Sequence, residues 1–204
     1  MPHRPVTPRT VIPRPVARRT AALTGALLAT VVLLAGCSTP DVSTGNDDLE
    51  TYGLDGMSAK EMIDSLEATP LDARATDLIA SVQPTDLVLK AGSGETTLPL
   101  PDDEFYLSVA PYVDETHPCS MHSLTTCTGE LGGEEIAVTV VDDASGETLL
   151  DETRELADNG FAGLWLPRDI EATLTITHDG KTATAPVTTD ENAETCLTTM
   201  QLSA

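Results

Sequence analysis

The sequence predicts an α+β protein in which short N-terminal helices are followed by a mostly antiparallel, β-sandwich-like C-terminal domain. Apolar residues with helical spacing lie between Ser58 and Ala68. From residue 134 onward, strand-like segments and turn residues alternate at a spacing of about 8–12 residues, which is typical of a sandwich. Aromatic residues are scarce, with one Trp, two Phe and three Tyr. The core must therefore be built from Leu, Val, Ile and Ala.

The pattern of residues 1–36 predicts a lipoprotein signal peptide that is not part of the fold. Five arginines and no acidic residue lie in the first 19 positions, and an apolar run of 15 residues follows from Ala21 to Ala35. This run is shorter than the roughly 20 residues that a membrane-spanning helix needs. The run ends in Leu-Ala-Gly-Cys, which resembles the bacterial lipobox. We therefore expect Cys37 to be lipidated and to anchor the protein to the outer face of the cytoplasmic membrane.

The mature chain is strongly acidic. After the five signal-peptide arginines are removed from 11 Lys+Arg, six basic residues face 33 Asp+Glu, which gives a net charge near −27. Such a chain lacks the basic patches that bind nucleic acid phosphates, so we expect no nucleic acid partner. Anionic lipid head groups should repel the chain as well, so contact with the membrane is expected through the lipid anchor only.

Residues 37–56 predict a flexible tether, because they are small, polar and acidic. Residues 57–113 predict a helical and hairpin region. Its first helix begins with a capping box of Ser58 and Glu61, and a second short helix is expected over Thr76–Val82. Helices this short are marginal alone, so they should pack on the sheet or on another copy of the chain. The region is therefore a candidate for homodimer formation.

Strands are expected in most of the remaining chain, and residues 114–204 predict a β-rich metal-binding domain. Asp179-Gly180 is the strongest two-residue hairpin signal in the sequence. The predicted strands cover residues 87–89, 97–100, 105–113, 136–141, 148–154, 161–166, 172–178, 181–187 and 196–202.

The cysteines carry the main chemical signal. With Cys37 assigned to the lipid, three remain, and an odd number cannot all pair within one exported chain. Cys119, His122 and Cys127 form C-x2-H-x4-C, and Cys196 lies on the last predicted strand. Thiolate is a soft ligand that favours Cu(I) and zinc, so these four residues predict a metal site. The alternative is one disulfide and one free thiol, which is common in exported proteins. The residues alone leave both interpretations open.

Other chemistry receives less support. Cys3His is also a structural zinc set, so zinc is the alternative metal. His117 is interpreted as a supporting or exposed residue, and Met121 as packing in preference to ligation. The chain has neither G-x-S-x-G nor H-E-x-x-H, so no hydrolase is predicted. The one enzymatic alternative is a thiol pair that reduces Cu(II) and becomes a disulfide.

The cysteine stretch resembles the signature of the CueP family of bacterial copper-binding proteins. The likeness begins with H-P-C-S-M-H-S-L-T-T-C-T-G-E-L at residues 117–131. It extends upstream to D-E-F-Y-L-S-V-A-P-Y-V at residues 103–113, and downstream to D-N-G-F-A-G-L-W-L-P-R-D-I-E at residues 158–171 and T-C-L-T-T at residues 195–199. It covers most of residues 50–202.

The resemblance implies an envelope protein of a copper-resistance system. Family members bind copper, form dimers, and are implicated in passing copper to a Cu/Zn superoxide dismutase, and cupric-reducing activity has been proposed for their cysteines. By resemblance, Cys119, Cys127 and Cys196 take the roles of the family cysteines, with His122 beside them. The lipobox departs from the soluble periplasmic members and favours copper buffering at the cell surface.

The sequence thus predicts a lipid-anchored extracytoplasmic protein that binds Cu(I) through thiolates for copper buffering, resistance or transfer. The competing interpretations are a structural or interaction lipoprotein stapled by a disulfide, and a thiol-dependent cupric reductase.

Overall fold

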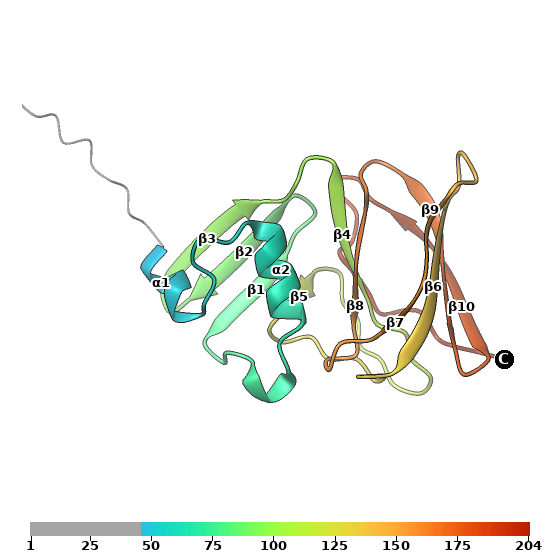
Figure 1. The fold of residues 1–204 in the computed structure, drawn as a ribbon, viewed down its shortest axis with the longest axis horizontal. Coiled ribbons are helices and arrows are strands. Elements are labelled where there is room, and N and C mark those ends of the chain that lie inside the picture. The colour runs from blue at the N-terminus through green and yellow to red at the C-terminus, as the bar shows by residue number, and fades with distance from the viewer. Residues whose placement is uncertain (1–45) are drawn as a thin grey trace, which may run out of the picture. The chain divides into compact units, whose positions relative to one another are not determined.

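The computed structural model describes residues 46–204, which form a β-rich body with two short α-helices (Figure 1). The predicted signal peptide, the predicted lipidation site Cys37 and the first part of the predicted tether lie outside the described residues. The later part of the tether range contains α1 (Asn46–Thr51). Among residues 46–204, no helix has the length and apolarity needed to cross a lipid bilayer.

Most strands pair in antiparallel fashion, which confirms the predicted β-rich character of the chain. Within residues 46–204, three sheets have the strand orders β3-β2-β1-β5, β10-β9-β6-β7 and β11-β4-β8, and of these strands only β11 pairs in parallel. The strands are β1 (Leu78–Val82), β2 (Asp86–Ala91), β3 (Gly94–Pro99), β4 (Glu104–Val109), β5 (His122–Ser123), β6 (Glu135–Asp142), β7 (Thr148–Glu155), β8 (Ala162–Pro167), β9 (Glu171–His178), β10 (Lys181–Thr188) and β11 (Cys196–Leu197).

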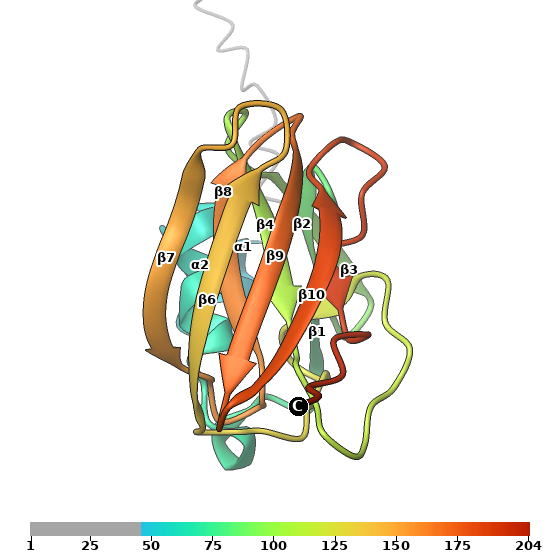
Figure 2. The ribbon, with the colours of Figure 1, turned by 90° about the vertical axis from the view of Figure 1, so that its right-hand side faces the viewer.

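The larger core lies between the second and third sheets. Figure 2 shows β7, β6, β9 and β10 as one layer in front of β8 and β4. Alternate residues of each strand face inward, as the period of two requires. The buried apolar residues that these strands contribute include Phe105, Leu107, Ile136, Val138, Leu164, Leu166, Leu174 and Ile176.

A second core lies under α2 (Ala59–Glu67), which covers the first sheet (Figure 1). The predicted capping box is present, because the Ser58 hydroxyl accepts from the backbone N–H of Glu61 and the Glu61 carboxylate accepts from the backbone N–H of Ser58. The apolar face of α2 buries Met62, Ile63 and Leu66.

The predicted helix over Thr76–Val82 is wrong, because this segment forms β1. Its buried residues Leu78, Ala80 and Val82 alternate with more exposed ones, a strand period, and β1 pairs along its whole length with β2. The segment is too short for periodicity alone to separate a helical turn from a strand, and pairing with the β2–β3 hairpin decides the outcome.

Strand β4 joins the two cores because it is buried on both faces. Phe105, Leu107 and Val109 belong to the larger core, whereas Tyr106 points to the opposite side and packs in the smaller core. Gly163 in β8 leaves room for the Tyr106 ring, since a Cβ there would lie within 3 Å of ring carbon atoms. The strand predicted over residues 105–113 therefore exists but ends at Val109.

The last predicted strand, residues 196–202, is also shorter than expected. Only Cys196 and Leu197 pair as β11, in parallel with Ser108 and Val109 of β4. Isolated bridges continue to Gln201 and Ser203. The short strand is nevertheless sufficient to fix Cys196 in the middle of the structure, where it is fully buried.

Candidate metal centre

The cysteine stretch is held against the first sheet by the two-residue strand β5. His122 pairs with Val82 and Ser123 with Ser81, both in β1. The backbone N–H of Leu124 donates to the carbonyl oxygen of Ala80 at 2.9 Å. His122 is therefore placed by main-chain pairing.

Thr195 connects this stretch to the strand that carries Cys196. Its hydroxyl donates to the carbonyl oxygen of Val82 at 2.6 Å and accepts from the backbone N–H of His122 at 3.1 Å. Its own backbone N–H donates to the carbonyl oxygen of Ser120 at 3.0 Å. One threonine thus fixes the distance between His122 and Cys196, which are 74 residues apart.

A tight turn returns the chain from His122 to Cys127. The backbone N–H of Cys127 donates to the carbonyl oxygen of Ser123 at 3.0 Å, and the Ser123 N–H points at Cys127 Sγ at 3.4 Å. Arg74 donates to the carbonyl oxygen of Cys127 at 2.8 Å. The turn therefore places the thiol of Cys127 back beside Cys119, as the spacing of the motif required.

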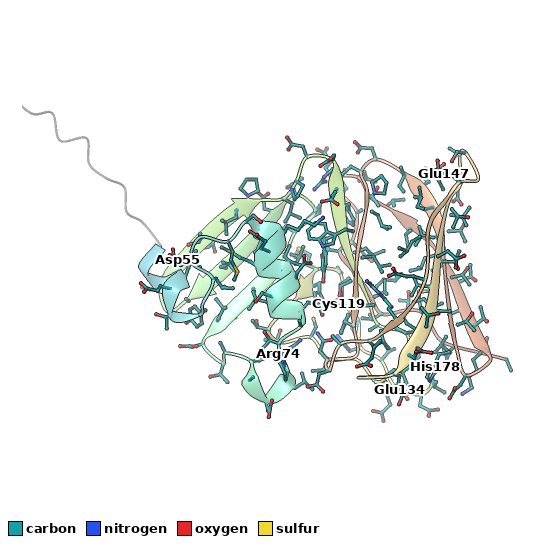
Figure 3. All side chains as sticks on the ribbon, in the orientation of Figure 1. Asp55, Arg74, Cys119, Glu134, Glu147 and His178 are labelled. Carbon is teal, nitrogen blue, oxygen red and sulfur yellow. A yellow bond between two sulfur atoms is a disulfide. The ribbon has the colours of Figure 1, made fainter. Side chains whose placement is uncertain are left out.

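The three sulfur atoms meet at one point. Cys119 and Cys196 form a disulfide with a Cα–Cα distance of 5.6 Å, and Cys127 is the free cysteine of the described residues. Cys127 Sγ lies 3.7 Å from Cys119 Sγ. Cys119 lies where the first sheet meets the sandwich (Figure 3). The predicted alternatives of a disulfide and a cluster of thiols therefore occur at the same place, since the disulfide joins two of the proposed ligands.

The imidazole of His122 is fully buried and has a polar partner on each side. Its Nε2 lies 2.8 Å from a carboxylate oxygen of Glu67, the last residue of α2. A carboxylate only accepts, so Nε2 carries the hydrogen. Nδ1 then faces the sulfur atoms and lies 3.9 Å from Cys196 Sγ. Such a carboxylate partner is the usual support for a metal-binding histidine, because it fixes the ring and its tautomer.

Glu67 is itself held by two further hydrogen bonds. The Tyr106 hydroxyl donates to the same carboxylate oxygen as His122 at 2.7 Å, and the Asn159 side-chain amide donates to the other oxygen at 2.7 Å. All four side chains are buried. The network joins α2, β4, β5 and the turn before β8 around the thiols.

Ionisation in this network follows from opposing effects of burial and charge. Burial favours neutral His122, but hydrogen bonds and charge interactions with Cys127 and Glu67 outweigh it and raise the pKa of His122 to about 9. Burial likewise disfavours the charged forms of Glu67 and Cys127, yet their hydrogen bonds to His122 hold the pKa of each below its ordinary value. The cluster therefore stabilises a thiolate at Cys127, the form that binds metals.

The aromatic ring of Phe161 closes the site on the sandwich side. It is fully buried and packs against His122, with ring centroids 4.6 Å apart and the ring planes tilted by 48°. The preceding residue, Gly160, has φ +79°, and its Cβ position would lie 2.7 Å from the backbone of Gly129. Only glycine fits this close approach, which brings the turn before β8 against the end of the cysteine stretch.

Within residues 46–204, two groups of three donor residues could hold a metal ion. One group is His122, Cys127 and Cys196, and the other is His117, Cys119 and Cys127. In each group the donor atoms lie within 4.8 Å of one another. The four residues predicted as ligands are thus brought together, and His117 joins them.

Met121, Met200 and the remaining described histidine are not among these donor residues. Met121 is 51 % exposed, Met200 packs in the larger core, and His178 bonds to the carbonyl oxygen of Glu135. Sequence reasoning missed Glu67, Asn159 and Arg74, because nothing in their local sequence distinguishes them from a helix end, a turn and a loop.

Comparisons with known proteins agree with the resemblance in the cysteine stretch. The family model of CueP, described as periplasmic copper-binding protein CueP, matches residues 61–201. The chain is also similar to a solved structure described as the crystal structure of S.CueP, with 38% sequence identity and a TM-score of 0.73. That similarity covers 78% of this chain and 96% of the other. A comparison with curated proteins finds no match.

Proposed function

This chain belongs to the CueP family of periplasmic copper-binding proteins, and we propose that it binds Cu(I) through the thiolates of Cys119, Cys127 and Cys196, with His122 as the fourth donor. The observation that carries the proposal is the meeting of three sulfur atoms and the Nδ1 atom of a buried histidine at one point. Thiolates are soft ligands and suit Cu(I) better than harder cations.

The role that we propose is copper buffering at the outer face of the cytoplasmic membrane. The buried side chains of Cys196 and His122 limit the access of water and oxidants to Cu(I), which suits storage or transfer to an acceptor such as a Cu/Zn superoxide dismutase. The lipobox before Cys37 supports a lipid anchor, and the homodimer inferred from the family remains a prediction. Detergent phase partitioning of the expressed chain tests the anchor: the wild type should enter the detergent phase and C37A should not.

Replacing Cys127 tests the copper site directly, because this cysteine is the residue common to both donor groups. C127S should weaken Cu(I) binding by more than about 100-fold, since loss of a direct ligand exceeds the 10–100-fold loss typical of an outer-shell partner. The measurement is anaerobic competition for Cu(I) against a chromophoric chelator, with thiols counted before and after. T126A, an exposed change in the same turn, is the control and should bind as the wild type does. Equal binding by C127S, or no binding by fully reduced wild type, would refute the proposal.

A second function, thiol-dependent reduction of Cu(II), is favoured by the disulfide itself. Oxidation of the thiolates of Cys119 and Cys196 to a disulfide releases two electrons, which would convert two Cu(II) to two Cu(I). Cys127 then remains beside the new Cu(I) as a thiolate ligand. The remaining alternative is a structural or interaction lipoprotein that binds no copper and is stabilised by the disulfide.

A further inference from the structure

The two donor groups differ in their access to solvent while they share one residue. His122 and Cys196 are fully buried, whereas His117 and Cys119 are partly exposed. Cys127 belongs to both groups and is itself partly exposed. Each group offers two sulfur atoms and one imidazole, so a Cu(I) ion would meet the same donor chemistry in either position.

His117 faces an open part of the surface. It lines a pocket of about 370 Å³ together with Glu115, Thr128 and Glu130. The carboxylate of Glu130 accepts from the backbone N–H of Val113 at 2.7 Å, so this acidic group is fixed at the pocket wall. A cation entering from solvent therefore meets negative charge first and His117 next.

The position of His117 is fixed by the segment that follows Cys196. The Thr198 hydroxyl donates to the carbonyl oxygen of His117 at 2.6 Å, and the Thr116 hydroxyl donates to the carbonyl oxygen of Thr198 at 2.6 Å. The His117 ring also makes an edge contact with Phe161, whose ring packs against His122. Phe161 thus contacts the imidazoles of both groups, one on the surface side and one inside.

We propose that His117, Cys119 and Cys127 form an outer Cu(I) position through which the ion enters and leaves the inner position, the site formed by Cys119, Cys127, Cys196 and His122. The proposal rests on the proposed function. The ion stays bound to Cys119 and Cys127 throughout and exchanges His117 for Cys196 and His122. Because both thiolates remain bound, no step leaves the ion with a single ligand.

The step balances without a redox partner. One bond to the ion breaks and two form, and the copper remains Cu(I). Of the two protons that leave the sulfur of Cys196 and the ring of His122, one is taken up by the vacated His117 and the other passes to solvent. The Cys119–Cys196 disulfide removes one sulfur from the outer position and two from the inner position, so the route is open only in the reduced protein.

His117 should therefore control the rate of copper exchange more than the affinity. In the reduced protein, H117Q should leave the Cu(I) affinity within about threefold of the wild type and slow loading and release by at least about tenfold, the lower end of the effect of a lost supporting group at a metal site. The measurements are anaerobic stopped-flow transfer of Cu(I) from and to a chromophoric chelator, and equilibrium competition with the same chelator.

Two further variants separate ligation from structure. H117M supplies a flexible soft donor at the same place and should recover most of the lost rate. H178Q removes a histidine outside the cluster and should exchange copper as the wild type does. Copper exchange at the wild-type rate in H117Q, or no recovery of the rate in H117M, would overturn the proposed outer position. A loss of Cu(I) affinity in H117Q as large as that in C127S would overturn it as well. Failure of the reduced wild type to retain Cu(I) would instead refute the proposed function.

Discussion

Replacing Glu67 with Gln is expected to lower the free energy of unfolding by about 3 kcal/mol, the low end of the cost of removing one partner from a buried charge pair. Three donors, from His122, Tyr106 and Asn159, converge on the two carboxylate oxygens. Gln presents one oxygen and one amide, so at least one of these donors loses its acceptor. Buried His122 also loses the negative charge next to Nε2, although it keeps the interaction with Cys127.

The difference in the free energy of unfolding between wild type and E67Q should change with pH, because Glu67 and His122 both titrate. The pKa of Glu67 is lowered in the folded protein. Its contribution to stability is therefore present above about pH 4.5 and is lost as the pH falls through the pKa of the folded state. The pKa of His122 is raised from 6.5 to about 9, so its contribution is complete below 6.5 and is lost as the pH rises through about 9. The difference is therefore expected to be largest between about pH 4.5 and 6.5 and to decline on both sides.

Urea unfolding of the oxidised protein at several pH values measures this difference. The matched control is E104Q, which removes a half-exposed carboxylate paired with Lys60 and should cost less than about 1 kcal/mol. An E67Q variant that is no less stable than E104Q would contradict the role given to the buried network. So would a difference that stays constant from pH 5 to pH 10.

The sequence singled out the cysteines and the histidine that meet at the candidate site but not the residues that support them. Cysteine and histidine are uncommon and chemically distinct, so their spacing pointed to metal or disulfide chemistry without a structure. Glu67 looks like any acidic residue at a helix end, and 55 residues separate it from His122. Only the packing of α2 on the first sheet and the pairing of β5 with β1 bring the two together.

The same limit explains the error in the fold prediction. The turn signals and the capping box are local, so α2, the β2–β3 hairpin and the β9–β10 hairpin could be predicted. Residues 78–82 are too few to show their period, and their strand character depends on β2 and β5 as partners. Likewise, the length of β11 depends on its partner β4, with which only Cys196 and Leu197 pair in parallel.

Reduction of the Cys119–Cys196 disulfide is expected to lower the free energy of unfolding by about 4 kcal/mol. The bond joins residues separated by 77 positions, and closing a loop of this length restricts the unfolded chain by roughly that amount. Excess Cu(I) should then restore most of the loss, because a ligand at 1,000 times its dissociation constant stabilises the folded state by about 4 kcal/mol. The disulfide in the oxidised protein and Cu(I) in the reduced protein would thus link the same two segments, those around Cys119 and Cys196.

The measurement is anaerobic urea unfolding of the oxidised, reduced, and reduced and copper-loaded protein, after removal of the reductant. The double variant C119S/C196S is the control: it should resemble the reduced protein, ignore the reductant and gain little from Cu(I), since Cys127 is then the remaining thiol of the cluster. If the protein were only a stapled lipoprotein, reduction would destabilise it and Cu(I) would not restore stability. If reduction had no effect, neither the disulfide nor the site built around it would contribute to the fold. Recovery by Cu(I) in the wild type, and not in the double variant, is the result that links copper binding to these two cysteines.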